Sequence, residues 1–166
     1  AELHALIAQS RLALGEALQR AVTTLRECLA AGGRVFTCGN GGSAAHAEHL
    51  AAELVGRYGN DRPGHGAIAL CANDAVLTSV ANDFGYEQVF ARQVECLAGP
   101  SDVLVAFSTS GSSRNVVAAA RRASEVGCPV IAFTGEQGGE LGRCSDIAVV
   151  VPSTRVCRIQ EIHQLC

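Results

Sequence analysis

Five short apolar runs, separated by longer segments with helical periodicity, constrain the fold of this chain more than any other feature. Each run is apolar at consecutive positions, which is typical of strands whose two faces are both buried in a parallel sheet. Parallel strands need a crossover between them, and the helical segments supply it. The runs are RVFTC at 34–38, AIALC at 67–71, DVLVAF at 102–107, PVIAF at 129–133 and IAVVV at 147–151.

The segments around these runs complete an α/β pattern. Leu3 to Ala31 spaces its apolar residues three or four apart, which predicts one long N-terminal helix that Gly32 and Gly33 end. The sequence therefore predicts a three-layer α/β/α sandwich with a five-stranded parallel sheet, in a single domain over residues 1–166. Further helices are expected at 44–58, 75–83, 87–97 and 114–126, with a short turn at 138–144 and a last helix from 155 onward.

Charge and hydropathy argue against several classes of partner. The net charge is −3, from 13 basic and 16 acidic residues, and no basic stripe is present, so we expect no nucleic-acid partner. No uncharged apolar run approaches the ~18 residues of a membrane span, and no signal-peptide pattern is present, so we expect a cytoplasmic protein without a membrane partner. The eight cysteines form no C-x-x-C pair, and we expect most of them to be buried as small hydrophobes.

The loop CGNGGSA follows the first strand and opens a helix, and ligands of open parallel sheets bind beyond the carboxyl ends of strands. Within it Asn40, Gly41 and Gly42 tolerate positive φ and let backbone amides approach a ligand. The loop also matches the loose dinucleotide pattern G-x-G-x-x-A, but Asp61, the acid at the right spacing, precedes the next strand instead of ending it. A nicotinamide site and a plain glycine-rich turn both stay open as alternatives.

The loop STSGSS at 108–113 follows the third strand and precedes a helix. The free amides and positive dipole end of that helix, together with a glycine at 111, form a cradle suited to a phosphate monoester. No lysine follows in G-K-S/T form, so the loop is not a nucleotide-triphosphate P-loop. An ordinary serine-rich N-cap is the alternative. The hydroxyls that would contact the phosphate are those of Ser108, Thr109, Ser110 and Ser113.

His49 and Glu53 lie four positions apart on the helix that the glycine-rich loop opens, so both side chains share one helical face. We expect the pair to lie about one turn below the loop, with His46 one turn further back. A histidine and a carboxylate at this spacing can share a divalent metal, or the carboxylate can act as a general base. A solvated surface pair is the alternative.

Together these segments resemble the sugar isomerase (SIS) family over nearly the whole chain. Within that family they resemble the aldose–ketose isomerases that convert D-sedoheptulose 7-phosphate to D-glycero-D-manno-heptose 7-phosphate in nucleotide-activated heptose biosynthesis. The resemblance implies a flavodoxin-like fold, a homotetramer and one zinc ion per subunit. It is carried, in the family's order and spacing, by CGNGGSAAHAEHLAAELVGRY, RPGHGAIAL, LTSVANDFGYEQVFARQVE, DVLVAFSTSGSSRNV, VIAFTGEQGGEL and RIQEIH.

The resemblance also implies roles for individual residues. Glu53 matches the catalytic carboxylate, and His49, Glu53 and Gln160 match zinc ligands. Ser43 and Arg57 are weaker candidates for substrate contact. The implied substrate-binding residues are Asn40, Gly41, Gly42, Glu53, Asn82, Asp83, Ser108, Thr109, Ser110, Ser113 and Gln160.

The chain departs from the family at its last helix. The family's fourth zinc ligand, also an acid/base group, is a histidine eight residues after the glutamine, which would be position 168, whereas the sequence ends at Cys166. We therefore expect the last helix to be cut short and zinc to bind weakly to three ligands. His163 and His46 are the candidates to replace the fourth ligand. His46 and Glu48 also stand where related isomerases commonly have Asp and Gln.

The implied reaction moves a proton between C1 and C2 of an open-chain sugar phosphate. Glu53 would take the proton, zinc would polarise the carbonyl, and the glycine-loop amides would share the oxyanion charge. The alternative from another class is a noncatalytic SIS protein that binds a sugar phosphate or a replication initiator as a regulatory module. Retention of both His49 and Glu53 argues for the enzyme.

Overall fold

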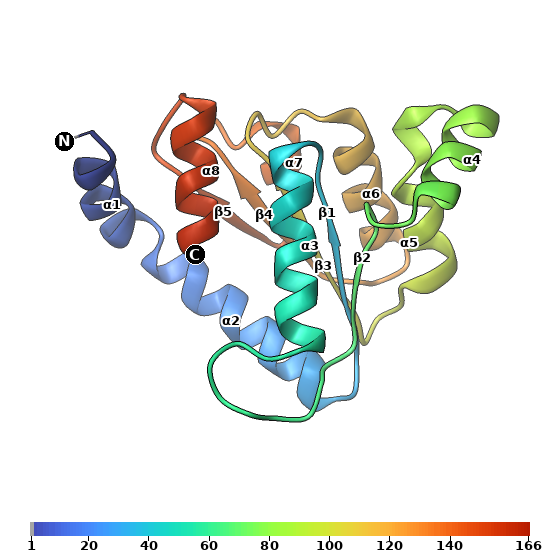
Figure 1. Cartoon of the computed structure of the whole chain (residues 1–166). Helices are drawn as coiled ribbons and strands as arrows, with labels where there is room; N and C mark the ends of the chain where they lie inside the picture. The colour runs from blue at the N-terminus through green and yellow to red at the C-terminus, as the bar shows by residue number, and fades with distance from the viewer. Residues whose placement is uncertain (1) are drawn as a thin grey trace.

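The computed structural model describes residues 2–166 and has the α/β architecture that the sequence predicts (Figure 1). Every strand pairing in the sheet is parallel. The strand order β2-β1-β3-β4-β5 is that of flavodoxin-like folds. The predicted strands are confirmed, with ends that shift by one or two residues. They are β1 (Val35–Cys38), β2 (Ala67–Ala69), β3 (Val103–Ser108), β4 (Val130–Thr134) and β5 (Ile147–Val150).

Helices cover both faces of the sheet and give two separate cores. Alternate strand residues point to opposite faces, so Phe36 and Leu104 pack in one core while Val35 and Val105 pack in the other. The helices of the first core are α4 (Asp74–Phe84), the 3-10 helix η1 (Tyr86–Gln88), α5 (Ala91–Leu97), α6 (Arg114–Glu125) and α7 (Gly139–Arg143). Those of the second are α1 (Glu2–Ala13), α2 (Gly15–Ala30), α3 (Gly42–Val55) and α8 (Val156–Leu165).

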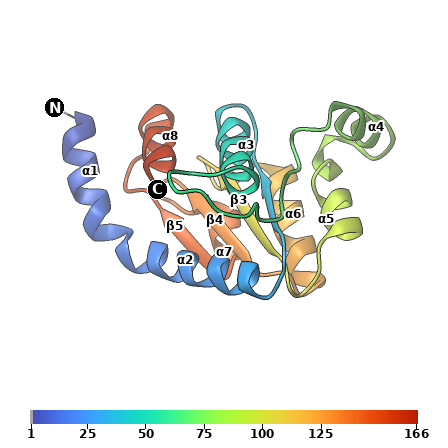
Figure 2. The same ribbon diagram turned by 60° about the horizontal axis from the view of Figure 1, so that its bottom comes forward.

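The N-terminal segment forms two helices, so the single long helix expected over Leu3 to Ala31 is wrong. α1 turns away from the axis of α2 at Leu14 (Figure 2). Gly15 weakens the helix there because it lacks a Cβ and has more backbone freedom. Leu14 itself is 2% exposed and anchors the bend in the core. None of the helices described over residues 2–166 is both long and apolar enough to cross a membrane.

Burial within the sheet follows strand position. The central strands β1, β3 and β4 are buried at every residue, as expected for a parallel sheet. The edge strands differ, because they have a neighbour on one side only, and Ile68 on β2 is 39% exposed. The expectation that most cysteines are buried is also wrong. All eight are free thiols, and only Cys28, Cys38 and Cys128 are fully buried among the residues that the structure describes.

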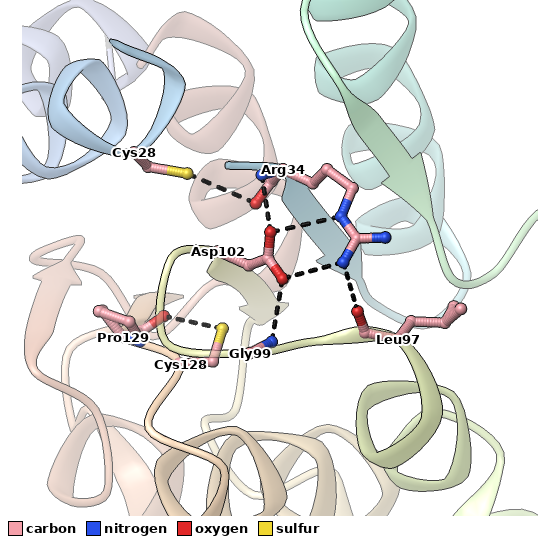
Figure 3. Close-up of polar contacts among 7 residues, drawn as sticks. All are labelled: Cys28, Arg34, Leu97, Gly99, Asp102, Cys128 and Pro129. Carbon is pink, nitrogen blue, oxygen red and sulfur yellow. Dashed lines mark hydrogen bonds and ion pairs between the residues drawn. The ribbon is translucent and has the colours of Figure 1, made fainter. Parts of the chain in front are cut away.

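A buried carboxylate joins the amino-terminal ends of β1 and β3 (Figure 3). Asp102, 3% exposed, accepts hydrogen bonds from the backbone N–H of Arg34 (2.8 Å) and of Gly99 (2.9 Å). The Arg34 guanidinium pairs with the same carboxylate at 3.2 Å and donates to the Leu97 carbonyl. Burial raises the pKa of the Asp102 carboxyl, but the hydrogen bonds and charge of Arg34 and the Gly99 N–H outweigh it. The pKa therefore lies below its ordinary value.

We predict that Asp102→Asn lowers the free energy of unfolding by roughly 1–3 kcal/mol at neutral pH, because an amide nitrogen would face N–H donors that now meet a carboxylate. The pKa of Asp102 is lower in the folded state than in the unfolded state. Its stabilisation is therefore present above the ordinary carboxyl pKa and is lost as pH falls through the lowered folded value. Urea unfolding of both proteins from neutral to acid pH should show the deficit of the variant shrinking in acid. A deficit of constant size would contradict this prediction.

Candidate active site

The two loops that the sequence singles out leave the sheet side by side, because β1 and β3 are neighbours. Cys38 at the end of β1 pairs in register with Ala106 near the end of β3. The strand order reverses here, since β2 follows β1 in sequence but lies on its other side. Ligands of open α/β sheets bind at such a switch point. The fold therefore places both loops where a ligand site is expected.

The glycine loop, residues 39–42, joins β1 directly to α3. Asn40, Gly41 and Gly42 are all expected to tolerate a positive φ. Among these three residues only Gly41 has one, at 54°. Gly42 is needed for close approach, because a Cβ at this position would lie 2.5 Å from Nε2 of Gln160. α8 thus holds the Gln160 carboxamide against the first residue of α3. The predicted substrate-binding residues Asn40, Gly41, Gly42 and Gln160 are brought together here.

An amide pair links the glycine loop to α6. Asn40 Nδ2 donates to Asn115 Oδ1 at 2.9 Å, and Asn115 Nδ2 donates to Asn40 Oδ1 at 2.8 Å. The Tyr86 hydroxyl donates to the same Asn40 oxygen at 3.1 Å. The sequence did not single out Asn115 or Tyr86. A polar residue in the first turn of a helix is common, and no spacing marks this one as part of a site.

The serine loop, residues 108–113, holds its hydroxyls in a defined arrangement at the start of α6. The Ser108 and Ser113 hydroxyls share a hydrogen bond of 3.0 Å, and Ser110 Oγ accepts the Ser112 N–H at 3.2 Å. The side chain of Ser113 does not cap the helix that follows it. The plain N-cap alternative therefore lacks its expected hydrogen bond. An anion at this loop would meet hydroxyls and the positive end of the α6 dipole.

Asn82 and Asp83 lie on the exposed side of this region, near the end of α4. Their side chains bond to each other, with Asn82 Nδ2 donating to Asp83 Oδ1 at 2.8 Å. Gly85 ends the helix, and Tyr86 then reaches Asn40. An ion pair of 2.8 Å between Glu87 and the Arg114 side chain ties η1 to the start of α6. The α4–η1 segment is thereby held beside both loops.

His49 and Glu53 share one face of α3, as predicted, with Nδ1 and Oε1 4.0 Å apart. They line a groove of about 420 Å³ between α2, α3, α8 and the sheet. The expected position, about one turn below the glycine loop, is wrong. α3 begins at Gly42, and Glu53 follows eleven residues later, roughly 16 Å or three turns along the helix. Figure 1 shows α3 running from the carboxyl edge of the sheet toward the opposite edge.

This separation decides which residues fit a shared metal. Within residues 2–166, no three His, Cys, Asp or Glu side chains converge on a point that could hold a metal ion. His49 and Glu53 supply two donors, which fits part of a zinc site. Gln160 does not join them in one chain, because its carboxamide lies against Gly42 at the other end of α3.

The partly buried His46 and the buried His163 form a second pair, with ring centroids 6.3 Å apart. The Nδ1 atom of each ring is buried and has no hydrogen-bond partner in the described part of the chain. His163 Nε2 lies 3.2 Å from the Thr134 carbonyl. Burial lowers the pKa of both rings, that of His163 to about 4, so both imidazoles are neutral at physiological pH.

Asp61 lies in the loop before β2, is paired with Arg57 at 3.6 Å, and has a side chain that is 90% exposed. A dinucleotide site of the type that the glycine pattern suggests needs its acid at the end of a strand. The geometry therefore does not support the nicotinamide alternative.

Comparison with known families gives the class of the protein. The sequence model that describes the SIS domain matches residues 1–135, a range that includes both loops and the His49–Glu53 pair. The chain belongs to the SIS domain family.

Individual relatives narrow this further. The chain is similar to the phosphoheptose isomerase of Helicobacter pylori strain P12, with 48% identity over 92% of this chain and 79% of the relative. It is also similar to the solved phosphoheptose isomerase of Neisseria gonorrhoeae, with 39% identity and a TM-score of 0.94 over 99% of this chain and 88% of that one. The solved phosphoheptose isomerase of Francisella tularensis is 36% identical to the chain. The two superpose with a TM-score of 0.95 over 99% of this chain and 87% of that one. Within the SIS family, the chain belongs to the phosphoheptose isomerases.

Proposed function

We propose that this chain is an aldose–ketose isomerase that converts D-sedoheptulose 7-phosphate to D-glycero-D-manno-heptose 7-phosphate in nucleotide-activated heptose biosynthesis. The observation that carries the proposal is the meeting of an amide-rich and a hydroxyl-rich loop at the β1–β3 switch point. Relatives that are identical to the chain at almost half of the aligned positions, and are named phosphoheptose isomerases, support the substrate class.

The serine loop would bind the phosphate. Its paired hydroxyls and the start of α6 offer donors to a dianion without a lysine or a metal. Binding energy from this end of the substrate, remote from the reacting carbons, would orient C1 and C2. The glycine loop and the Gln160 carboxamide would contact the sugar beside it. The contact of Gln160 with Gly42 supports a substrate-binding role for this glutamine more directly than a metal-binding one.

Glu53 would act as the general base. It takes the proton from C1 of the open-chain ketose, leaving an enediolate across C1 and C2. The O1 hydroxyl proton moves to O2, and return of the first proton at C2 gives the aldehyde at C1. Donors of the glycine loop would stabilise the enediolate oxygen. The Glu53 side chain is 32% exposed and lies in a groove open to a substrate. Its partner His49 would orient the carboxylate.

The distance along α3 supports a site shared between subunits. In one chain Glu53 lies roughly 16 Å from the glycine loop. A seven-carbon sugar phosphate with its phosphate at the serine loop would have to span much of this distance to present C1 to Glu53 of the same chain. We propose that each site takes its loops from one chain and Glu53 from the partner subunit, within the homotetramer that the resemblance implies.

Exposed apolar side chains support an assembly through the N-terminal helices. Leu12 on α1 is 89% exposed and Val22 on α2 is 48% exposed. Tyr58 and Leu165, both largely exposed, line the same groove as Glu53. A partner surface over these residues would remove them from water and would enclose the groove in which the proton is transferred.

We further propose that His49 and Glu53 are zinc ligands and that a histidine at position 168 would complete the set. α8 packs beside α3, and its last residues Leu165 and Cys166 line the groove with Glu53. If α8 continued past Cys166, position 168 would lie roughly 12 Å beyond Gln160 along the helix, toward the His49–Glu53 pair. A bound zinc ion would supply Lewis-acid polarisation of the substrate carbonyl.

The noncatalytic alternative is not favoured, since the chain keeps Glu53 and its relatives are named as enzymes. We also propose that the protein acts in the cytoplasm. Its eight cysteines are all free thiols, which suits a reducing compartment.

We predict that Glu53→Gln lowers kcat by at least ~100-fold while KM changes little, because the amide fills the same space but cannot accept a proton. Glu48→Gln is the matched control, since it makes the same change of charge on an exposed residue of the same helix. The control should keep kcat within about twofold. Steady-state turnover of sedoheptulose 7-phosphate measures both. Near wild-type turnover of Glu53→Gln would remove Glu53 as the base.

The shared site predicts complementation between two inactive variants. One carries Glu53→Gln, and the other carries Ser110→Ala with Ser113→Ala. Random mixing in an oligomer leaves about a quarter of the sites with both halves intact, so co-expressed mixtures should recover about a quarter of wild-type turnover. Two different affinity tags and tandem purification ensure that only mixed oligomers are assayed. Turnover no greater than that of the separate variants would show that each chain builds its own site.

Zinc binding gives a further prediction. The chain of residues 1–166 should bind zinc more weakly than a version extended through a histidine at position 168, since a stable zinc site usually has four ligands. Competition with a chromophoric chelator measures the affinity, and isomerase turnover is followed in parallel. Replacing the added histidine by alanine is the control. Equal affinity with and without the histidine would show that residues within 1–166 complete the site.

A further inference from the structure

The orientation of the Asn40 carboxamide can be deduced from a single backbone donor. The N–H of Val116 lies 3.0 Å from one side-chain atom of Asn115. A backbone N–H can only donate, so this atom must be the oxygen, Oδ1. The other atom of the same amide is then the nitrogen, Nδ2. The usual ambiguity between the two ends of an asparagine side chain is thereby removed at Asn115.

This assignment carries over to Asn40. Asn115 Nδ2 lies 2.8 Å from Asn40, so the Asn40 atom that faces it must be the acceptor oxygen. The Tyr86 hydroxyl donates to that same oxygen at 3.1 Å. Asn40 Nδ2 uses one of its two hydrogens on Asn115 Oδ1, at 2.9 Å. The second N–H of Asn40 is the group left for a ligand, and the carboxamide cannot turn over without placing donors against donors.

Asn115 is well placed to impose this orientation. It is 3% exposed and lies in the first turn of α6, two residues after Ser113 of the serine loop. Removing the hydrogen-bond partners of a buried amide costs more free energy than removing those of an exposed amide. The pair therefore joins the glycine loop to the helix that follows the serine loop, across neighbouring strands β1 and β3.

We propose that Asn115 is a positioning residue for the isomerase reaction, which fixes Asn40 so that an N–H donor faces the substrate oxygen that becomes the enediolate. This inference rests on the proposed function. Asn115 itself would not touch the substrate. Its effect comes through Asn40, because a donor already aimed at the position of developing charge lowers the barrier more than one that must reorient during the reaction.

The first test compares two substitutions that each remove a hydrogen-bonded side-chain amide. Asn115→Leu keeps the branched shape of the side chain but has no polar group. Gln93→Leu is the matched control, because Gln93 donates to the carbonyls of Leu70 (2.9 Å) and Val89 (2.8 Å), and neither partner belongs to the glycine loop or the serine loop. Steady-state kinetics are measured at a temperature well below the thermal unfolding midpoints of both variants. We expect kcat of Asn115→Leu to fall at least about tenfold with KM within about threefold, and kcat of the control to stay within about twofold.

The second test uses the pH profile of Asn115→Asp. When its carboxyl is protonated, the hydroxyl can donate to Asn40 Oδ1 and the carbonyl oxygen can accept, as the native amide does. When it ionises, two acceptors face each other and Asn40 loses its orientation. The ratio of variant to wild-type kcat should therefore rise toward acid pH, as the introduced carboxyl becomes protonated. A role in stability alone would leave this ratio independent of pH among folded molecules.

The outcomes separate this inference from the proposed function. If the wild-type chain does not turn over sedoheptulose 7-phosphate, the proposed function fails and the inference fails with it. If the wild-type chain is active and Asn115→Leu keeps wild-type kcat, or Gln93→Leu loses as much, the positioning role is wrong while the function stands. A kcat loss confined to Asn115→Leu, together with acid recovery of Asn115→Asp, supports the inference.

Discussion

The parallel pairing of β1 with β3 is the constraint on which the site depends. Polar contacts secure this pair of strands at both ends: the Asp102 carboxylate binds the backbone before β1, and the Asn40–Asn115 amides join the elements that follow. Between them the strands are buried at every position. A shift of register by one residue would therefore exchange side chains between the two cores and misalign the two loops. The position of the candidate ligand site therefore depends on the pairing of β1 with β3.

The helix α3 sets the second constraint, because its regular rise fixes the distance between the glycine loop and each residue along the helix. It starts at the glycine loop and runs without interruption to Val55, so His49 lies near its middle and Glu53 near its far end. The glycine loop and the proposed base consequently lie at opposite ends of one rigid element. This separation is the basis of the proposed site shared between two copies of the chain, which would link activity to assembly.

Much of this could be predicted from the sequence, and the failures have physical causes. Consecutive apolar residues predicted all five strands, because burial on both faces leaves no room for polar side chains. Gly15, one glycine within an otherwise regular pattern, was enough to bend the N-terminal helix at Leu14. The distance of Glu53 from the glycine loop was predicted wrongly, although its position eleven residues after Gly42 in the same helix determines it. Asn115 could not have been found, since its partner Asn40 is 75 residues away and only the fold brings them together.

Proton transfer at the substrate is the central claim, and solvent deuterium reports on it directly. The purified protein is incubated with D-sedoheptulose 7-phosphate in deuterium oxide, and the products are analysed by NMR and mass spectrometry. An isomerase that works through an enediolate and exchanges its proton with solvent predicts D-glycero-D-manno-heptose 7-phosphate with deuterium at C2, together with exchange at C1 of the remaining ketose. Recovery of the ketose alone, without deuterium on its carbons, would contradict the account.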